Sequence, residues 1–214
     1  MHLIAPSLLA ADFGNLQGEL AMINESNADW LHIDVMDGVF VPNISFGFPI
    51  MKPLKKYCTK PLDVHLMIVH PEKYVERFCD AGACSVGFHL EAVEDPLPIL
   101  DLIKNKGVRT CLTINPDIAV ERLFPYLDKV DMVLVMSVFA GFGGQAFIPQ
   151  TLDKLRALRQ EIDSRGLPTL IEVDGGVNID NAGEIWAAGV DVIVAGSAVF
   201  KAPNPKEAID QIKR

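Results

Sequence analysis

Apolar residues gather in eight short runs along the 214-residue chain, at positions 3–9, 30–36, 62–67, 84–90, 108–114, 132–138, 169–175 and 190–196. In the second run, Leu31, Ile33 and Val35 alternate with His32 and Asp34. A period of two places alternate side chains on opposite faces of a β-strand. The pattern therefore predicts eight short strands, of which the second carries polar groups on one face.

Helical periodicity separates several of these runs. Four apolar residues recur at helical spacing before Gly166, namely Leu152, Leu155, Leu158 and Ile162. Asn204, Pro205 and Glu207 fit a helix start, with a capping side chain, a first-turn proline and an acidic third position. Eight strands with intervening helices favour an α/β fold, a single-domain (β/α)₈ TIM barrel over residues 1–214, above an open doubly wound sheet.

Composition and charge narrow the possible partners. Half of the residues are hydrophobic, which suffices for one large core. The formal net charge of −9, without a Lys or Arg cluster, argues against nucleic acid or an anionic membrane as partner. The start of the chain does not resemble a signal peptide and no apolar stretch is long enough to span a membrane, so we expect a cytoplasmic protein. Four cysteines without CxxC spacing are expected to be buried free thiols.

Metal-ligand residue types stand near the carboxyl ends of three predicted strands. They are His32 and Asp34 in the second run, His65 in the third and Asp174 in the seventh. Functional groups of α/β barrels sit at this end of the strands. If all four point inward, they suit a borderline divalent ion, with N and O ligands at about 2.0 to 2.2 Å.

A single histidine on a strand is more often a hydrogen-bonded core residue, and that alternative remains open for each residue taken alone. Four unpaired polar groups inside one barrel would each incur a desolvation penalty of about 1 to 3 kcal/mol. Convergence therefore favours one divalent metal ion per chain, with Zn²⁺ or Fe²⁺ preferred and Mn²⁺ or Co²⁺ as alternatives.

Glycine-rich segments follow the last three predicted strands. They are Gly141 to Gln145, then Gly175 and Gly176, then Gly196 with Ser197. Any one glycine pair can be an ordinary tight turn. Loops after the last strands of these barrels often bind phosphate through backbone N–H groups. Three such loops at one end predict an anion site that needs no basic patch.

These motifs resemble the ribulose-phosphate 3-epimerase family across nearly the whole chain. The resemblance is carried by "APSLLAADF", "HIDVMDGVFVPNISFG", "KPLDVHLM", "HLEA", "GFGGQAF", "IEVDGGV" and "VAGSAVF". It implies a metal-dependent TIM barrel that interconverts D-ribulose 5-phosphate and D-xylulose 5-phosphate in the pentose phosphate pathway. It also implies a homo-oligomer, either a dimer or a hexamer.

The resemblance assigns a role to each candidate residue. His32, Asp34, His65 and Asp174 would bind the metal, while Asp34 and Asp174 would exchange the proton at C3. Substrate-binding residues would be Ser7, His65, Gly141, Phe142, Gly143, Gly144, Gly175, Gly176, Gly196 and Ser197. Chemistry agrees, because inverting a carbon beside a ketone requires acid/base groups on two faces and positive charge near the enediolate. Met36, Met67 and Met136 are either a soft surface over this intermediate or simple core filler.

Three alternatives compete with this interpretation, and the first of them is disfavoured by its motif. Related barrels that decarboxylate or condense sugar phosphates use an Asp-x-Lys-x-x-Asp motif, but His65 stands where the lysine would be. An epimerase acting on a hexulose 6-phosphate such as allulose 6-phosphate would share the metal and glycine motifs. A catalytically silent binding barrel is the third, because Phe139 and Ala140 replace a polar residue and proline usual in the family.

Overall fold

The computed structural model describes residues 2–214 and places all eight predicted strands in one parallel sheet. The strands are β1 (Leu3–Pro6), β2 (Leu31–Met36), β3 (Leu62–Met67), β4 (Ala83–His89), β5 (Arg109–Ile114), β6 (Met132–Met136), β7 (Leu170–Asp174) and β8 (Val192–Ala195). From β2 to β8 each strand pairs with its sequence neighbour, and β1 pairs with β8. A parallel bridge between Ser7 and His32 joins β1 to β2 and completes the ring. The predicted TIM barrel is confirmed.

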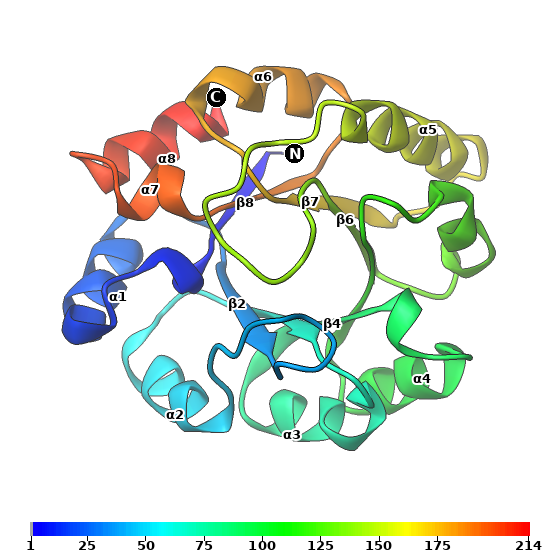
Figure 1. The fold of residues 1–214 in the computed structure, drawn as a ribbon, viewed down its shortest axis with the longest axis horizontal. Helices are drawn as coiled ribbons and strands as arrows, with labels where there is room; N and C mark the ends of the chain where they lie inside the picture. Colours follow the sequence, from blue (N-terminus) through cyan, green and yellow to red (C-terminus); the bar gives the residue numbers. More distant parts are fainter. Residues whose placement is uncertain (1) are drawn as a thin grey trace.

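Helices surround this ring of strands (Figure 1). The α-helices are α1 (Leu16–Glu25), α2 (Phe48–Tyr57), α3 (Val75–Asp80), α4 (Leu97–Asn105), α5 (Thr151–Ser164), α6 (Ile179–Ala187), α7 (Ser197–Phe200) and α8 (Pro205–Lys213). Short 3₁₀ helices η1 (Leu8–Ala10), η2 (Phe13–Asn15), η3 (Pro71–Lys73), η4 (Leu90–Ala92) and η5 (Val120–Tyr126) lie between them. The connection from β5 to β6 thus uses a 3₁₀ segment in place of an α-helix.

The predicted helix signals hold in the structure. The apolar face of α5 is buried through Leu155, Leu158 and Ile162. At the start of α8, the side chain of Asn204 accepts a hydrogen bond from the backbone N–H of Glu207, and Pro205 occupies the first turn. These caps satisfy backbone groups that helix ends leave without partners.

The first predicted strand is shorter than the apolar run that suggested it. Pairing with β8 ends at Pro6, opposite Ala195, and residues 8–10 form η1 instead. The cause is the partner strand, because β8 also ends at Ala195 and leaves no ladder for later residues. This turn carries Ser7 to the mouth of the barrel.

Two faces of β2 explain its unusual pattern. Leu31, Ile33 and Val35 pack in the large core between strands and helices. His32 and Asp34 point to the opposite side, inside the barrel, and both are buried. The polar face of this strand therefore belongs to the interior of the ring.

All four cysteines are free thiols, as predicted; Cys79 and Cys111 are buried, whereas Cys58 and Cys84 are only half-buried. Within residues 2–214, no helix combines the length and the apolar character needed to cross a membrane.

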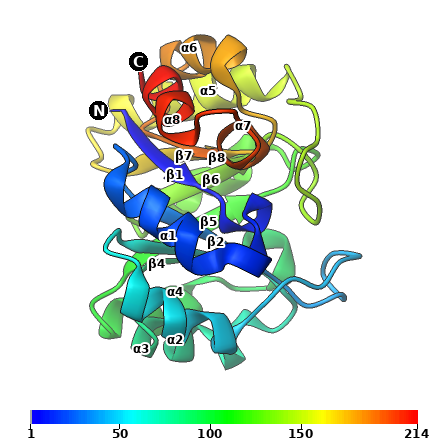
Figure 2. The same cartoon turned by 90° about the vertical axis from the view of Figure 1, so that its left-hand side faces the viewer.

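Figure 2 shows two long loops extending from the same end of the barrel, beyond the carboxyl ends of the strands. One joins β2 to α2 and the other joins β6 to α5. They are tied together, since Asn43 Nδ2 donates to the carbonyl oxygen of Gly141 at 2.8 Å. This end of the molecule holds the candidate site.

Candidate active site

Four predicted ligands converge at the carboxyl end of the barrel. His32, Asp34, His65 and Asp174 each offer one N or O atom, and these atoms all lie within 4.8 Å of one another. Strand register produces this convergence, because Asp34 pairs directly with His65 across β2 and β3. Asp174 is the last residue of β7 and completes the group from another part of the ring.

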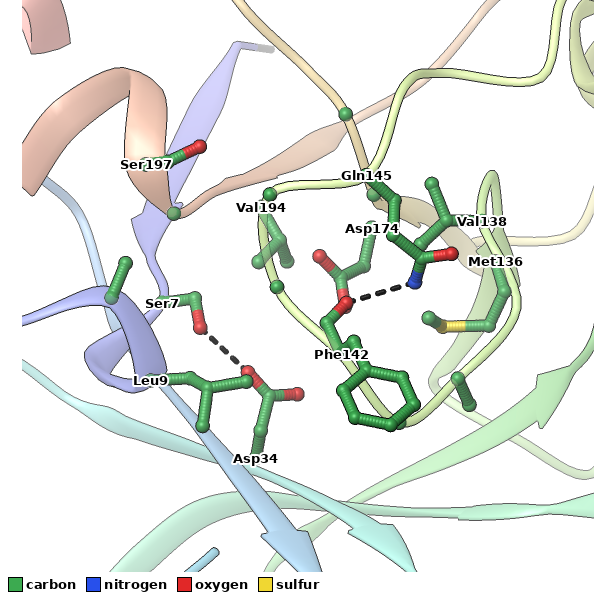
Figure 3. A pocket seen from close by; sticks show the side chains of 18 of the residues that line it. Ser7, Leu9, Asp34, Met136, Val138, Phe142, Gln145, Asp174, Val194 and Ser197 are labelled. Carbon is green, nitrogen blue, oxygen red and sulfur yellow. Dashed lines mark hydrogen bonds between the residues drawn. The ribbon is translucent and has the colours of Figure 1, made fainter. Parts of the chain in front are cut away.

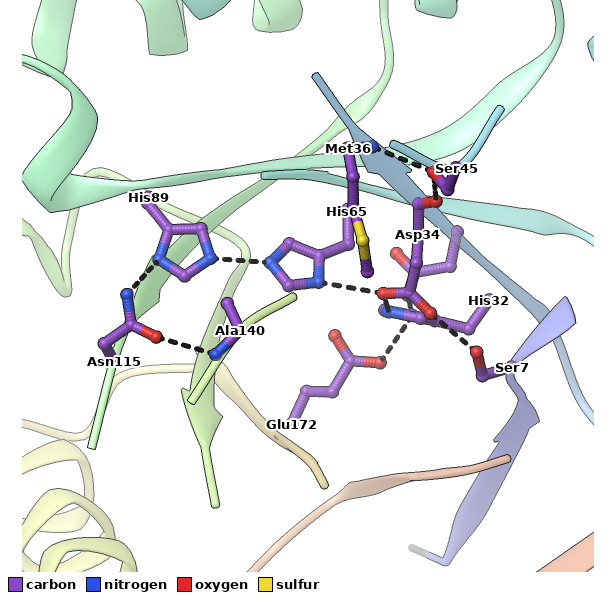
Figure 4. Close-up of polar contacts among 11 residues, drawn as sticks. Ser7, His32, Asp34, Met36, Ser45, His65, His89, Asn115, Ala140 and Glu172 are labelled. Atoms are coloured by element: carbon purple, nitrogen blue, oxygen red, sulfur yellow. Dashed lines mark hydrogen bonds and ion pairs between the residues drawn. The ribbon is translucent and has the colours of Figure 1, made fainter. Parts of the chain in front are cut away.

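Contacts around Asp34 orient these side chains (Figures 3 and 4). Ser7 Oγ donates to Asp34 Oδ2 at 2.6 Å, and His65 Nδ1 lies 3.2 Å from Asp34 Oδ1. His32 Nδ1 lies 2.7 Å from Asp63 Oδ2, which turns its Nε2 toward Asp34 Oδ1 at 3.3 Å. That Nε2 atom is buried without a hydrogen-bond partner. An imidazole nitrogen aimed at carboxylates without a bond of its own is what a metal ligand needs.

The charges of this cluster favour a cation. Burial lowers the pKa of His32, but the negative charges of Asp34 and Asp63 and the hydrogen bond to Asp63 outweigh it and raise this pKa well above its usual value. Burial also raises the pKa of Asp34, but His32 and His65 outweigh it and hold this pKa well below its usual range. The carboxylates therefore attract positive charge to the space between the rings.

His65 and Asp174 respond in other ways to the same environment. Burial lowers the pKa of His65 to about 4, so its ring is neutral at pH 7 and has a lone pair to offer. Loss of contact with water raises the pKa of Asp174 to about 7, and the charge of Asp34 adds to the rise. The two imidazoles and two carboxylates include one ring nitrogen, His32 Nε2, that has no hydrogen-bond partner. This set of ligands fits a Zn²⁺ or Fe²⁺ ion.

A cavity opens above the cluster, and the glycine loops form its walls. Its lining includes Ser7, Asp34 and Asp174, together with the predicted residues Gly141, Phe142, Gly143, Gly144, Gly175, Gly176, Gly196 and Ser197. Among the described residues that line it, none is a lysine or arginine. His32 and His65 lie beneath this surface, so the predicted direct contact of His65 with substrate is not supported by the cavity lining.

Three methionines also line the cavity, namely Met36, Met67 and Met136. They are almost fully buried and come from β2, β3 and β6. They form an apolar part of the cavity lining and also belong to the buried core, so their position fits both interpretations.

Positive backbone φ angles shape the glycine loops. Gly141, Gly144, Gly175 and Gly176 all adopt φ between +64° and +125°. At Gly176, a Cβ atom would lie 2.2 Å from the backbone N of Phe147, so the loop after β7 approaches the loop after β6 too closely for any side chain. Glycine is required there both for conformation and for space.

The two residues that depart from the family pattern lie at the start of the β6–α5 loop. Phe139 is 53% exposed, so it does not pack into the protein as a substitute for the missing polar residue. The backbone N–H of Ala140 donates to Asn115 Oδ1 at 3.1 Å. A proline at position 140 has no N–H and would not form this bond.

Sequence reasoning missed several polar residues around the cluster. They are Asp63, Glu172, His89 and Asn115. Glu172 lies two residues before Asp174 and so shares its face, which is the signal that would have revealed it. His89 ends β4 just as the other ligand-type residues end their strands. Asn115 follows β5 and has no comparable pattern.

Comparison with known proteins identifies the family of this chain. The family model described as "Ribulose-phosphate 3 epimerase family" matches residues 3–200.

The chain belongs to the ribulose-phosphate 3-epimerase family.

Curated relatives of the family match almost end to end. The ribulose-phosphate 3-epimerase of Escherichia coli K12 is 47% identical over 213 residues, covering 99% of this chain and 95% of the relative. The enzyme of Synechocystis is 48% identical, and the alignment covers 98% of this chain and 92% of the relative. The enzyme of Mycobacterium tuberculosis is 44% identical, and the alignment covers 99% of this chain and 92% of the relative.

More distant solved structures share the barrel of this epimerase family. A 3-hexulose-6-phosphate synthase superposes with a TM-score of 0.71 at 18% identity, covering 100% of this chain and 98% of that one. The N-(5'-phosphoribosyl)anthranilate isomerase of Pyrococcus furiosus has a TM-score of 0.68 at 17% identity, with the same coverage. At this level of identity, the likeness supports the fold alone.

Proposed function

We propose that this chain is a metal-dependent epimerase that interconverts D-ribulose 5-phosphate and D-xylulose 5-phosphate. The observation that carries the proposal is the convergence of His32, Asp34, His65 and Asp174 beneath a cavity walled by glycine loops. Family membership and near-complete alignment with ribulose-phosphate 3-epimerases support the choice of substrate.

Two carboxylates supply the acid and base that epimerisation requires. Inverting C3 removes its proton from one face and returns a proton to the other, so two groups must reach the substrate from different sides. Asp34 and Asp174 both line the cavity and come from β2 and β7, with β1 and β8 between them in the ring. Figure 3 shows both carboxylates directed into the cavity. We assign the removal and return of the proton to these two side chains.

A divalent ion would be held by His32 Nε2, His65 Nδ1 and one carboxylate oxygen each of Asp34 and Asp174. When bound, the ion supplies positive charge that stabilises the negative charge developing on the substrate oxygens. Asp63 fixes the ring of His32 through its Nδ1, and Ser7 holds the second oxygen of Asp34. These partners orient the ligand atoms before substrate arrives.

Backbone donors would hold the phosphate end of the substrate. The loops at Gly141 to Gly144, Gly175 to Gly176 and Gly196 to Ser197 all line the cavity. Glycines allow the backbone to approach the phosphate closely, and backbone N–H groups bind anions without side-chain charge. This arrangement suits a protein whose net charge of −9 would otherwise repel the substrate.

The proposal is tested by assaying metal-reconstituted protein on D-ribulose 5-phosphate and on allulose 6-phosphate in deuterated water. We expect a much higher kcat/KM on the pentulose, with deuterium incorporated at C3. Asp34→Asn and Asp174→Asn should each abolish net epimerisation, whereas Asp153→Asn on exposed α5 should leave the rate unchanged. A preference for the hexulose would reassign the substrate, and absence of turnover on both would favour the silent barrel.

We further propose a homo-oligomer, dimer or hexamer, located in the cytoplasm. Light scattering coupled to gel filtration measures the mass of the assembly against 23.4 kDa per chain. A mass of one chain at micromolar concentration would contradict the first part of this proposal.

A further inference from the structure

His89 ends β4 behind the candidate metal cluster, and the proposed function gives it no role. Its side chain is completely buried. Its Nε2 lies 2.9 Å from His65 Nε2, and its Nδ1 lies 3.4 Å from Asn115 Nδ2 and 3.6 Å from Glu91 Oε1. Phe40 covers the ring, with centroids 4.7 Å apart. His89 does not line the cavity and cannot contact substrate there.

A continuous series of polar contacts runs through His89 (Figure 4). It begins at Asp34, passes through the rings of His65 and His89 to Asn115, and ends at the backbone N–H of Ala140. Ala140 belongs to the β6–α5 loop that walls the cavity. The series therefore joins the metal cluster to the loop proposed to hold phosphate.

The donor and the acceptor of each contact in this series can be assigned, starting from Ala140. A backbone N–H only donates, so Asn115 must turn its Oδ1 to Ala140 and its NH₂ group to His89. His89 Nδ1 then accepts, and its proton resides on Nε2. That proton is donated to His65 Nε2, which leaves the proton of neutral His65 on Nδ1, pointing at Asp34 Oδ1. Every group is satisfied, but the lone pair of His65 Nδ1 is blocked.

Metal ligation by His65 Nδ1 requires that donor and acceptor be exchanged between His65 and His89. The proton of His65 must then be on Nε2, where it is donated to His89 Nε2. The proton of His89 moves to Nδ1, so that the number of protons on the two rings is unchanged. The carboxylate beside that Nδ1 is Glu91: its Oε1 lies 3.6 Å from Nδ1 and accepts from the backbone N–H of Asn115, while its Oε2 is buried without a hydrogen-bond partner. The Nδ1–H of His89 would reach this carboxylate once the two side chains move slightly closer. The NH₂ group of Asn115 would now face a second donor and must move away.

We propose that His89 is a positioning residue that orients the metal ligand His65 and links ion binding there to the loop backbone at Ala140. This inference rests on the metal-dependent function proposed above. Glu91 stabilises the ion-bound arrangement and Asn115 the ion-free one. Because the link ends on a backbone N–H, it requires a residue other than proline at position 140.

Imidazole ¹⁵N spectra of the full chain test the proton positions directly. The chain has five histidines, so the signals can be assigned by single substitutions. In chelator-treated protein we expect the proton of His65 on Nδ1 and that of His89 on Nε2. After loading with one Zn²⁺ per chain, the proton of His89 should be on Nδ1, and the amide signal of Ala140 should shift. In His89→Phe the Ala140 shift on loading should be lost.

Zn²⁺ affinity, measured by competition with a chromophoric chelator, separates positioning from packing. His89→Phe should weaken binding by about 10- to 100-fold, the usual effect of removing the partner of a ligating histidine. Asn115→Leu should leave the affinity unchanged or raise it, because only the ion-free arrangement loses a bond. Phe88→Leu, on the outward face of the same strand, should lower Tm without changing the affinity.

Failure of the link and failure of the proposed function give different results. Zn²⁺-loaded protein whose His89 keeps its proton on Nε2, or His89→Phe with unchanged Zn²⁺ affinity, would overturn the link and leave the epimerase proposal intact. A chain that binds no divalent ion at His32, Asp34, His65 and Asp174 would overturn the metal-dependent function and the link together.

Discussion

At the scale of single residues, two of the candidate ligands, His32 and Asp34, are each held by a residue outside the ligand set. Asp63 takes Nδ1 of His32 and leaves Nε2 without a bond, while Ser7 takes one oxygen of Asp34. Such partners fix the orientation of a ligand before the ion arrives, which reduces the entropy lost on binding. The orientation of the candidate ligands therefore depends on residues outside the ligand set.

Replacing Asp63 tests this dependence. Asp63→Ala removes the acceptor from His32 Nδ1 and frees the ring to rotate, so the affinity for Zn²⁺ should fall by about 10- to 100-fold. Asp63→Asn retains an acceptor oxygen and should lose much less. Titration with a competing chelator measures both values. Equal affinity of Asp63→Ala and the unaltered chain would show that packing alone holds His32.

Asp37, at the start of the β2–α2 loop, provides a prediction on pH. Burial raises the pKa of Asp37, but hydrogen bonds from the backbone N–H groups of Val39, Val69 and Phe40 outweigh it and lower this pKa. A lowered pKa stabilises the fold above the unfolded value of about 3.9 and is lost as pH falls through the folded value. The contribution should therefore be constant from pH 7 to 5, begin to fall near pH 4 and disappear below the lowered pKa of the folded state.

Urea unfolding of Asp37→Ala at several pH values measures this contribution. At pH 7 the variant should be less stable by about 1 kcal/mol, the typical net value of such hydrogen bonds. The difference should vanish at acid pH. Asp153→Asn is the control, since its ion pair with Arg156 is exposed and worth little. A pH-independent loss in Asp37→Ala would indicate a packing effect.

At the scale of elements, loops after different strands are fitted to one another at the mouth of the barrel. The β6–α5 loop lies against the β2–α2 loop through Asn43 and Gly141, and against the β7–α6 loop through Phe147 and Gly176. Gln145 closes the β6–α5 loop on itself by donating to the carbonyl oxygens of Phe139 and Phe142. The proposed phosphate site thus depends on contacts between elements.

Two glycines with the same backbone conformation allow a matched test of loop packing. Gly176 and Gly166 have φ of +64° and +61°, but only Gly176 would bring a Cβ against backbone, whereas Gly166 has no atom within 4 Å. Gly166→Ala should cost about 1 kcal/mol from backbone strain alone. Gly176→Ala should cost clearly more and raise KM for the phosphosugar. Thermal unfolding and steady-state kinetics compare the two, and equal losses would contradict the packing argument.

At the scale of the whole molecule, closure of the ring brings together ligands from distant parts of the sequence. Asp34 and Asp174 are 140 positions apart, yet both line one cavity because β1 and β8 connect their strands around the barrel. An ion bound to both therefore binds only the closed ring. Ion binding and folding are expected to be coupled.

Thermal unfolding with and without Zn²⁺ tests this coupling. A free ion concentration of about 100 times Kd adds roughly 2.7 kcal/mol to the free energy of unfolding. For a chain of this size, the gain corresponds to a Tm increase of roughly 5 to 10 °C. A chelator should reverse the shift, and Asp174→Asn should reduce it. An unchanged Tm in the folded, ion-loaded protein would contradict binding across the ring.

The sequence by itself determined the elements and the chemistry of the site. Period-two alternation and helical spacing are local properties, so they predicted the strands, the face of α5 and the cap at Asn204 from the residues alone. The same alternation predicted that His32 and Asp34 point inward, and the position of ligand-type residues at strand ends suggested where His65 and Asp174 lie.

Only the tertiary structure decided how these groups contact one another. Where β1 ends depends on where β8 ends, and whether His65 reaches the cavity depends on Asp34 lying above it. The contacts of His89 with His65 and of Asn115 with Ala140 join different strands and loops, so no spacing along the chain encodes them. Hydrogen bonds form between atoms a few ångströms apart in space, and that proximity arises only when the ring of strands closes.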